Sequence, residues 1–143
     1  MASAESKEYD LERFVKAQEG VYDRACTELR AGRKSSHWMW FIFPQIRGLG
    51  ASEMSMRFAI SSLDEARAYL AHPVLGPRLR EATAIVAGLA GKTAEHIFGY
   101  PDDMKFRSSM TLFAKAAENE SIFEIALSKY FDGEMDAETL KRI

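Results

Sequence analysis

The chain has 143 residues, which corresponds to about one domain on the usual range of roughly 100 to 200 residues. Its 19 basic and 21 acidic side chains leave a formal charge of −2, so no global field draws it to nucleic acid or to an anionic membrane. Apolar residues make up 47% of the chain, which excludes a disordered protein. We predict a single domain over residues 1–143, with 1–9 as a flexible N-terminal segment.

The first predicted helix begins near Asp10 and stops before Gly32, because apolar side chains recur along it at steps of three and four. The next segment, 37–43, is apolar all round and ends at Pro44. Its pattern fits a buried strand as well as a short buried helix. The helical neighbourhood and the stop at the proline favour the helix.

Further helices follow at short intervals. Apolar residues indicate one around 54–60, and Ser62 and Glu65 form a capping-box pattern for a helix from Leu63 to just before Pro73. The remaining predicted helices cover about 77–89, 93–98, a stretch from Pro101, about 120–131, and 136 to the terminus. Seven to eight helices with short connections, and no alternating strand pattern, predict an all-α globular domain.

The stretch after Gly32 is a candidate anion site. Arg33 and Lys34 lie just ahead of a predicted helix start, where the helix dipole and free N–H groups favour an anion. With the hydroxyls of Ser35 and Ser36, they would form a receptor for a phosphate or a carboxylate. The alternative is a solvated cationic turn in which one of these serines caps the helix.

The aromatic run offers a second set of candidates. Trp38 and Trp40 can stack on a flat ring, His37 can serve as an acid or base near neutral pH, and Gln45 adds a polar group beside them. Pockets often combine aromatic area with a few polar groups in this way. The alternative is that the run is the buried core and His37 a hydrogen-bonded boundary residue.

The helix after Pro101 carries a polar stripe opposite its apolar residues. The stripe consists of Asp102, Lys105, Ser108 and Ser109. The alternative is that Asp102 caps the helix and the others form a solvated or interhelical face. The loop from Arg47 to Ser52 can bring N–H groups to an anion, although it lacks the third glycine of a dinucleotide fingerprint.

Cysteine and histidine content argues against a metal centre. Cys26 is the single cysteine, and the three histidines show no ligand spacing, so we predict no metal and no cofactor. The longest apolar run, Trp38 to Pro44, is too short to span a bilayer, and no signal peptide is evident. We therefore expect a cytoplasmic protein.

Several motifs resemble a known bacterial family. They are HWMWFIFPQ at 37–45, GLG at 48–50, HPVLG at 72–76 and PDDxKxRSSMTLF at 101–113. The family is a domain of unknown function whose members are small, all-helical, and sometimes labelled "calpastatin". The resemblance implies an all-α fold and no established activity, substrate or cofactor. Calpastatin inhibitors are disordered, weakly apolar repeats, which nothing here matches. A looser similarity is to helical proteins that handle NAD or ADP-ribose derivatives.

Our leading hypothesis is that segment 33–45, the loop 48–52 and the stripe 102–109 meet in a pocket for an anionic, ring-bearing small molecule of nucleotide or ADP-ribose type. In an enzyme, His37 or Asp102 would act as the acid or base. The ligand-binding candidates are Arg33, Lys34, Ser36, Trp38, Trp40, Gln45, Arg47, Lys105, Ser108 and Ser109. The competing hypothesis is a non-enzymatic interaction or structural module, monomeric or homodimeric, whose aromatic run is core or dimer contact.

Overall fold

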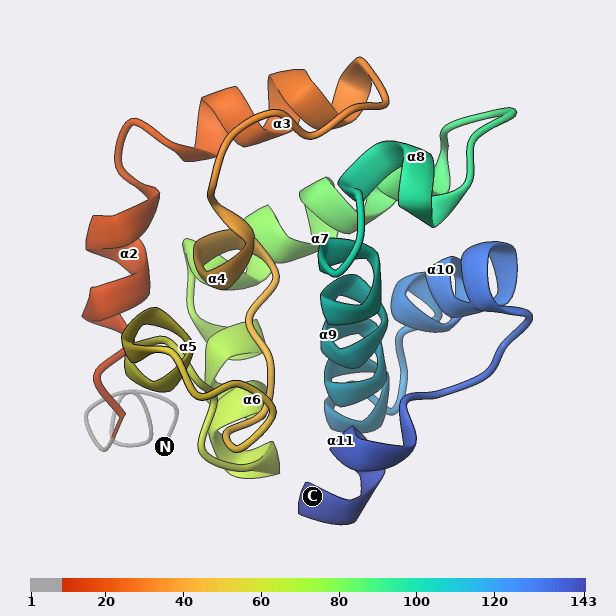
Figure 1. Ribbon diagram of the computed structural model, residues 1–143. Helices are drawn as coiled ribbons and strands as arrows, with labels where there is room; N and C mark the ends of the chain where they lie inside the picture. The colour runs from red at the N-terminus through yellow and green to blue at the C-terminus, as the bar shows by residue number, and fades with distance from the viewer. Residues whose placement is uncertain (1–8) are drawn as a thin grey trace.

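The computed structural model describes residues 9–143, and within this range every regular element is a helix (Figure 1). The ten helices are α2 (Glu12–Gln18), α3 (Tyr22–Arg30), α4 (Met39–Ile42), α5 (Glu53–Arg57), α6 (Leu63–Ala71), α7 (Leu75–Ala87), α8 (Ala94–Phe98), α9 (Asp102–Ala116), α10 (Ile122–Phe131) and α11 (Ala137–Arg142). They share one hydrophobic core, so the predicted all-α domain is confirmed. Ten helices exceed the seven to eight expected. Of the predicted flexible segment 1–9, only Tyr9 is described, and it packs against the core; the rest lies outside the described residues.

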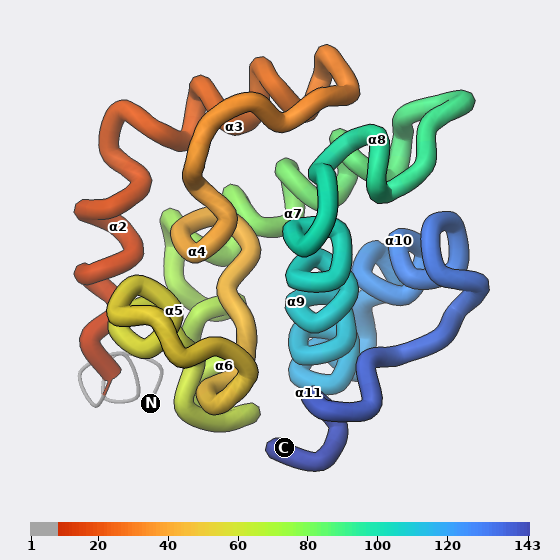
Figure 2. The backbone as a smooth tube through the Cα atoms, in the orientation of Figure 1, coloured from red at the N-terminus to blue at the C-terminus, as the bar shows by residue number. Residues whose placement is uncertain are grey.

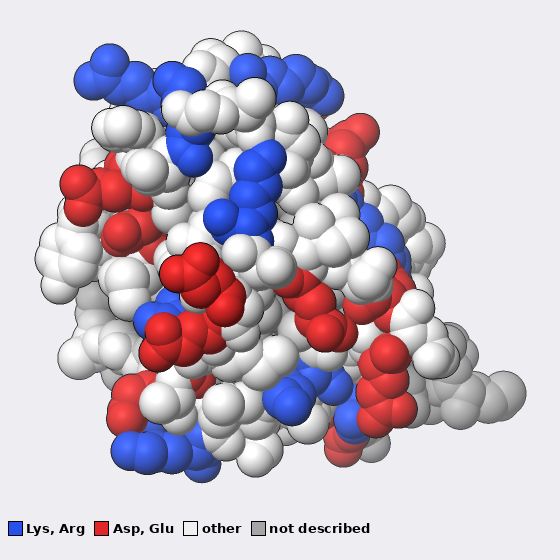
Figure 3. Space-filling model, turned by 90° about the vertical axis from the view of Figure 1, so that its right-hand side faces the viewer, with Lys and Arg blue, Asp and Glu red and all other residues white. Residues whose placement is uncertain are grey.

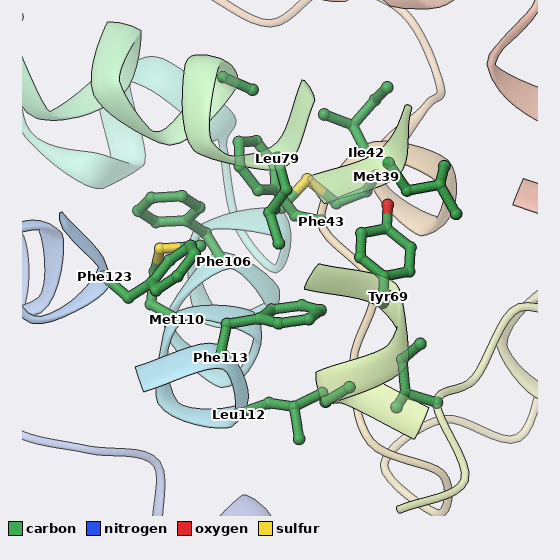
Figure 4. Close-up of a cluster of buried hydrophobic side chains, with 14 of the residues drawn as sticks. Met39, Ile42, Phe43, Tyr69, Leu79, Phe106, Met110, Leu112, Phe113 and Phe123 are labelled. Atoms are coloured by element: carbon green, nitrogen blue, oxygen red, sulfur yellow. The ribbon is translucent and has the colours of Figure 1, made fainter. Parts of the chain in front are cut away.

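The longest helix, α9, lies in the middle of the domain and contacts α4, α6, α8, α10 and α11. Figure 4 shows Phe106, Met110 and Phe113 of α9 with Tyr69 on one side and Phe123 on the other. All five side chains are fully buried. Because α9 is anchored in the core, it fixes the positions of the polar side chains on its first turns, such as Asp102 and Lys105.

Part of the aromatic run 37–43 belongs to this core. Phe43 packs edge-on against Phe106, with ring centroids 5.0 Å apart, and Trp38 is only 1% exposed. The predicted short helix is confirmed as α4, a single turn. Trp40, by contrast, is only partly buried. One tryptophan of the run thus serves the core and the other remains near the surface.

The prediction of one helix from Asp10 to Gly32 is wrong. The chain breaks at Gly20, whose φ of +71° lies in the left-handed region, and α2 and α3 are separate helices that run in different directions (Figure 2). Glycine adopts this conformation without a steric cost, which is why it often ends helices. The apolar pattern stays in step across the break, so periodicity alone does not reveal it.

The helix predicted around 54–60 ends early, at Arg57. Ile60 instead pairs with Ile46 in an isolated parallel bridge, in which the N–H of Ile60 donates to Gln45 O and the N–H of Arg47 donates to Ile60 O, both at 2.8 Å. The bridge fixes the path of the segment that enters the glycine-rich loop at 48–50.

No helix within residues 9–143 has the length and apolar content needed to cross a bilayer.

The predicted cap at Ser62 is confirmed, since its Oγ accepts the Glu65 N–H at 3.1 Å. The Glu65 carboxylate accepts from Ser61, at 2.7 Å from both N and Oγ, rather than from the cap residue's own N–H.

We expect Ser62→Ala to lower the free energy of unfolding by about 1 kcal/mol, measured by urea denaturation, and Ser62→Gly by a few tenths. An alanine variant as stable as the wild type would contradict this role.

Candidate functional site

A pocket of about 290 Å³ lies where the segment 40–50 meets the first turns of α9. Its lining includes Trp40, Gln45, Leu49, Met104, Lys105 and Ser108. The bridge at Ile46 holds Gln45, Trp40 is carried by α4, and α9 holds Met104, Lys105 and Ser108 on one face. Four of the candidates proposed from the sequence therefore line one pocket, although more than 50 residues of chain separate the two groups.

Lys105 carries the positive charge of this pocket. Its Nζ lies 5.6 Å from the centroid of the Trp40 ring and 3.5 Å from Oδ1 of Asp102. The ring attracts the ammonium group through its negative face, and the carboxylate attracts it from the preceding turn. The Lys105 side chain remains 30% exposed, so a molecule in the pocket can reach the charge.

The indole N–H of Trp40 is shielded from solvent and has no acceptor among the described residues. A buried donor without an acceptor costs about 1–3 kcal/mol, and native proteins usually avoid this cost. Because the nitrogen is shielded, a molecule in the pocket would contact the indole ring and not its N–H. Ser108 differs, because its Oγ donates to Met104 O at 3.1 Å and keeps its lone pairs to accept.

Asp102, a proposed acid or base, is the first residue of α9 and pairs with two lysines. Its Oδ2 lies 2.8 Å from Nζ of Lys34, and its Oδ1 faces Lys105. The Lys34 side chain is only 7% exposed, and its Nζ lies 5.1 Å from the centroid of the Trp38 ring. The carboxylate thus links the pocket to the 33–36 segment and holds both lysines.

The N–H groups proposed as an anion receptor already have an anion, the carboxylate of Glu28. It accepts from Ser35 N at 2.7 Å, Ser36 N at 3.0 Å, Ser36 Oγ at 2.5 Å and Trp38 Nε1 at 2.9 Å. Burial raises the pKa of Glu28, but these hydrogen bonds outweigh it and lower the pKa to about 2. Ser36 and Trp38 accordingly face Glu28 and not the pocket.

The other candidates lie outside the pocket. His37 and Arg47 are exposed, and Ser109 is fully buried in the interior, where its Oγ has no described partner. Arg33 and Lys34 line a second hollow. Among residues 9–143 no group of three or more His, Cys, Asp or Glu side chains is arranged to hold a metal ion.

Known proteins share this chain's sequence and fold. A family model described as "Protein of unknown function (DUF1810)" matches residues 8–143. The chain belongs to the DUF1810 family. A similar solved structure is the crystal structure of the conserved hypothetical protein Rv1873 from Mycobacterium tuberculosis, with 54% identity, a TM-score of 0.92, and coverage of 94% of this chain and 96% of that one. No protein with a curated description matches. The resemblance to a family of unknown function is thus confirmed.

The pocket of this DUF1810 protein also includes Asp136 and Glu138, which sequence reasoning missed. The Asp136 carboxylate caps α11 by accepting from Thr139, and Glu138 pairs with Lys141 and Arg142. Their place in the pocket depends on the return of α11 to α9, and a cap motif at the end of the chain gives no sign of that return. Sequence reasoning also missed Glu28. Its position in the sequence indicates only a residue on a helix, and its contacts with the 35–38 segment depend on the fold.

Proposed function

We propose that this DUF1810 protein binds a small anionic molecule with a flat ring, of nucleotide type, in the pocket between segment 40–50 and α9. The observation that carries the proposal is the convergence of Trp40 and Lys105 on one pocket. A cation and an aromatic ring side by side suit a ligand that has an anionic group next to a ring. Gln45 and Ser108 add the few polar groups that orient a ligand in such pockets.

Lys105 is able to change partners at little cost. Its pair with Asp102 spans 3.5 Å and is partly exposed, and exposed pairs of this kind contribute at most about 1 kcal/mol. The same carboxylate has a shorter pair, 2.8 Å, with the nearly buried Lys34. A phosphate or carboxylate can therefore take Lys105 without leaving Asp102 unpaired.

The lining fits the remainder of such a ligand. Trp40, Leu49 and Met104 present apolar surface for a ring. The volume, about 290 Å³, lies just below the roughly 300–1,000 Å³ found for ligand pockets. This size favours a mononucleotide, and a molecule as large as ADP-ribose would extend beyond the mouth.

The proposal is for binding and not for catalysis. His37 does not line the pocket, and Asp102, Asp136 and Glu138 are all engaged in ion pairs or caps. A binding role needs none of these groups to be free. It needs only that Lys105 and the aromatic wall be accessible, as their exposure allows.

The test is a titration with adenosine monophosphate, ADP and ADP-ribose at constant ionic strength, followed by thermal unfolding and tryptophan fluorescence. A ligand at 100 times its Kd is expected to stabilise the wild type by about 2.7 kcal/mol. Lys105→Gln should weaken binding at least about tenfold, or about 1.4 kcal/mol. Lys115→Gln, on the same helix and exposed, is the control that should bind normally.

Two results would contradict the proposal. One is equal affinity of the Lys105→Gln and wild-type proteins, which would place the ligand elsewhere. The other is no response to any compound of the panel, which would favour the interaction module, in which the aromatic segment serves as core or as a contact between proteins.

A further inference from the structure

A second hollow has a volume of about 530 Å³. It is connected to the pocket through Asp102, which pairs with one lysine from each of the two. It forms where the loop at 32–34 meets the segment 92–99. Lys34 lines the hollow and pairs with one oxygen of Asp102, while Lys105 lines the pocket and pairs with the other. The two concavities are thus separate sites on either side of one carboxylate.

The two walls of the hollow bring cations together from distant parts of the chain. Lys92 lies against Gly32, so closely that a Cβ at this glycine would be 3.0 Å from Lys92 Cε and 3.5 Å from its Nζ. Gly32 also has a φ of +75°, which favours glycine. The ammonium group of Lys92 therefore lies next to the backbone that carries Arg33.

The charges in this hollow are not balanced by the protein. Arg33 and Lys92 form no ion pair with any residue in the range 9–143. Glu95 is the one acidic residue among the lining residues. Figure 3 shows Lys and Arg gathered at the upper end of the molecule, the end at which α3 and α8 lie in Figure 1. Like charges that are held together raise the free energy, and a bound anion would lower it.

We infer that this hollow binds a phosphate-type oxyanion, as the free ion or as the phosphate of a small molecule. A guanidinium fork from Arg33 and an ammonium group from Lys92 are the donors that phosphate recognition uses most. A small anion fits better than a nucleic acid, because the net charge is −2 and Glu95 and Asp102 border the cations. The inference is independent of the ligand proposed for the neighbouring pocket.

The experiment is an amide chemical-shift titration of the full chain with inorganic phosphate and with pyrophosphate, in which sodium chloride keeps the ionic strength constant. We expect saturable shifts at 32–34 and 92–99, and these are followed separately from any shifts at the neighbouring pocket. The double variant Arg33→Ala/Lys92→Ala should bind at least about tenfold more weakly. Both side chains are exposed, so the variant should keep the wild-type Tm.

Lys115→Gln is the matched control, because it removes an exposed cation that does not line the hollow, and it should bind phosphate there as the wild type does. Shifts that do not saturate, or equal affinity of the double variant, would overturn the inference. A short single-stranded oligonucleotide forms the third arm. If it bound at the same residues more tightly than pyrophosphate, with a steep salt dependence, the small-anion assignment would be replaced by a nucleic-acid site.

Discussion

Replacing Gly76 with alanine is expected to lower the free energy of unfolding by about 3 kcal/mol, the upper part of the range for overpacked sites. Gly76 is buried on the first turn of α7, where a Cβ would lie 2.1 Å from the carbonyl oxygen of Leu70 and 2.8 Å from Nη1 of Arg80. The first of these atoms is backbone, so α6 and α7 would have to move apart. Arg80 would then also lose its bond to Leu70 O, 3.2 Å long.

The sign of this change opposes simple helix propensity, which favours alanine over glycine by about 1 kcal/mol within a helix. Gly88→Ala is the control, since Gly88 follows the same helix with φ −86° and its Cβ would approach no closer than 3.2 Å to another atom. We expect a change below about 1 kcal/mol for it. Urea denaturation of both variants provides the measurement. A Gly76→Ala protein as stable as the wild type would show that the two helices can separate freely.

Local patterns predicted much of this fold. The serine cap before α6, the stop at Pro44 and the apolar face of α9 each depend on residues near one another in sequence, and each is present in the structure. The break at Gly20 was missed because the apolar spacing continues through it. Two helices joined at a left-handed glycine can carry the same periodic pattern as one continuous helix, so sequence periodicity cannot separate the two cases.

The site shows the same limit at longer range. Trp40 and Lys105 were both candidates by residue type, and the structure brings them to 5.6 Å, but their proximity depends on how α4 packs beside α9. Trp38 looked equivalent to Trp40 in the sequence. The difference arises from Glu28, ten residues away, which accepts the Trp38 N–H and so leaves Trp40 alone at the pocket. A single acidic residue on a helix face carries no sign of this role.

Glu28→Ala is expected to lower the free energy of unfolding by about 2–3 kcal/mol, because hydrogen bonds to a charged group contribute roughly 1.5–3 kcal/mol. The carboxylate accepts two backbone N–H groups, a hydroxyl and an indole N–H, and without it the 35–38 segment loses its connection to α3. Thermal and urea unfolding measure the loss. Glu118→Ala, at an exposed position after α9, should change stability by less than about 0.5 kcal/mol.

The pH dependence of the stability of Glu28→Gln separates the effect of the negative charge of Glu28 from the effect of its side-chain shape. Because the folded pKa of Glu28, about 2, is below its ordinary value of 4.5, the ionised carboxylate stabilises the fold fully above pH 4.5, and this contribution disappears as the pH falls toward 2. Solvent screening at this half-buried position limits the contribution to about 2 kcal/mol. Glutamine keeps one carbonyl acceptor but has no charge to lose. The stability gap between wild type and Glu28→Gln should therefore be widest near pH 6 and close as the pH approaches 2, since protonation removes the advantage of the wild type. A gap that stayed constant from pH 6 to pH 2.5 in urea denaturation would mean that the carboxylate acts through its shape alone.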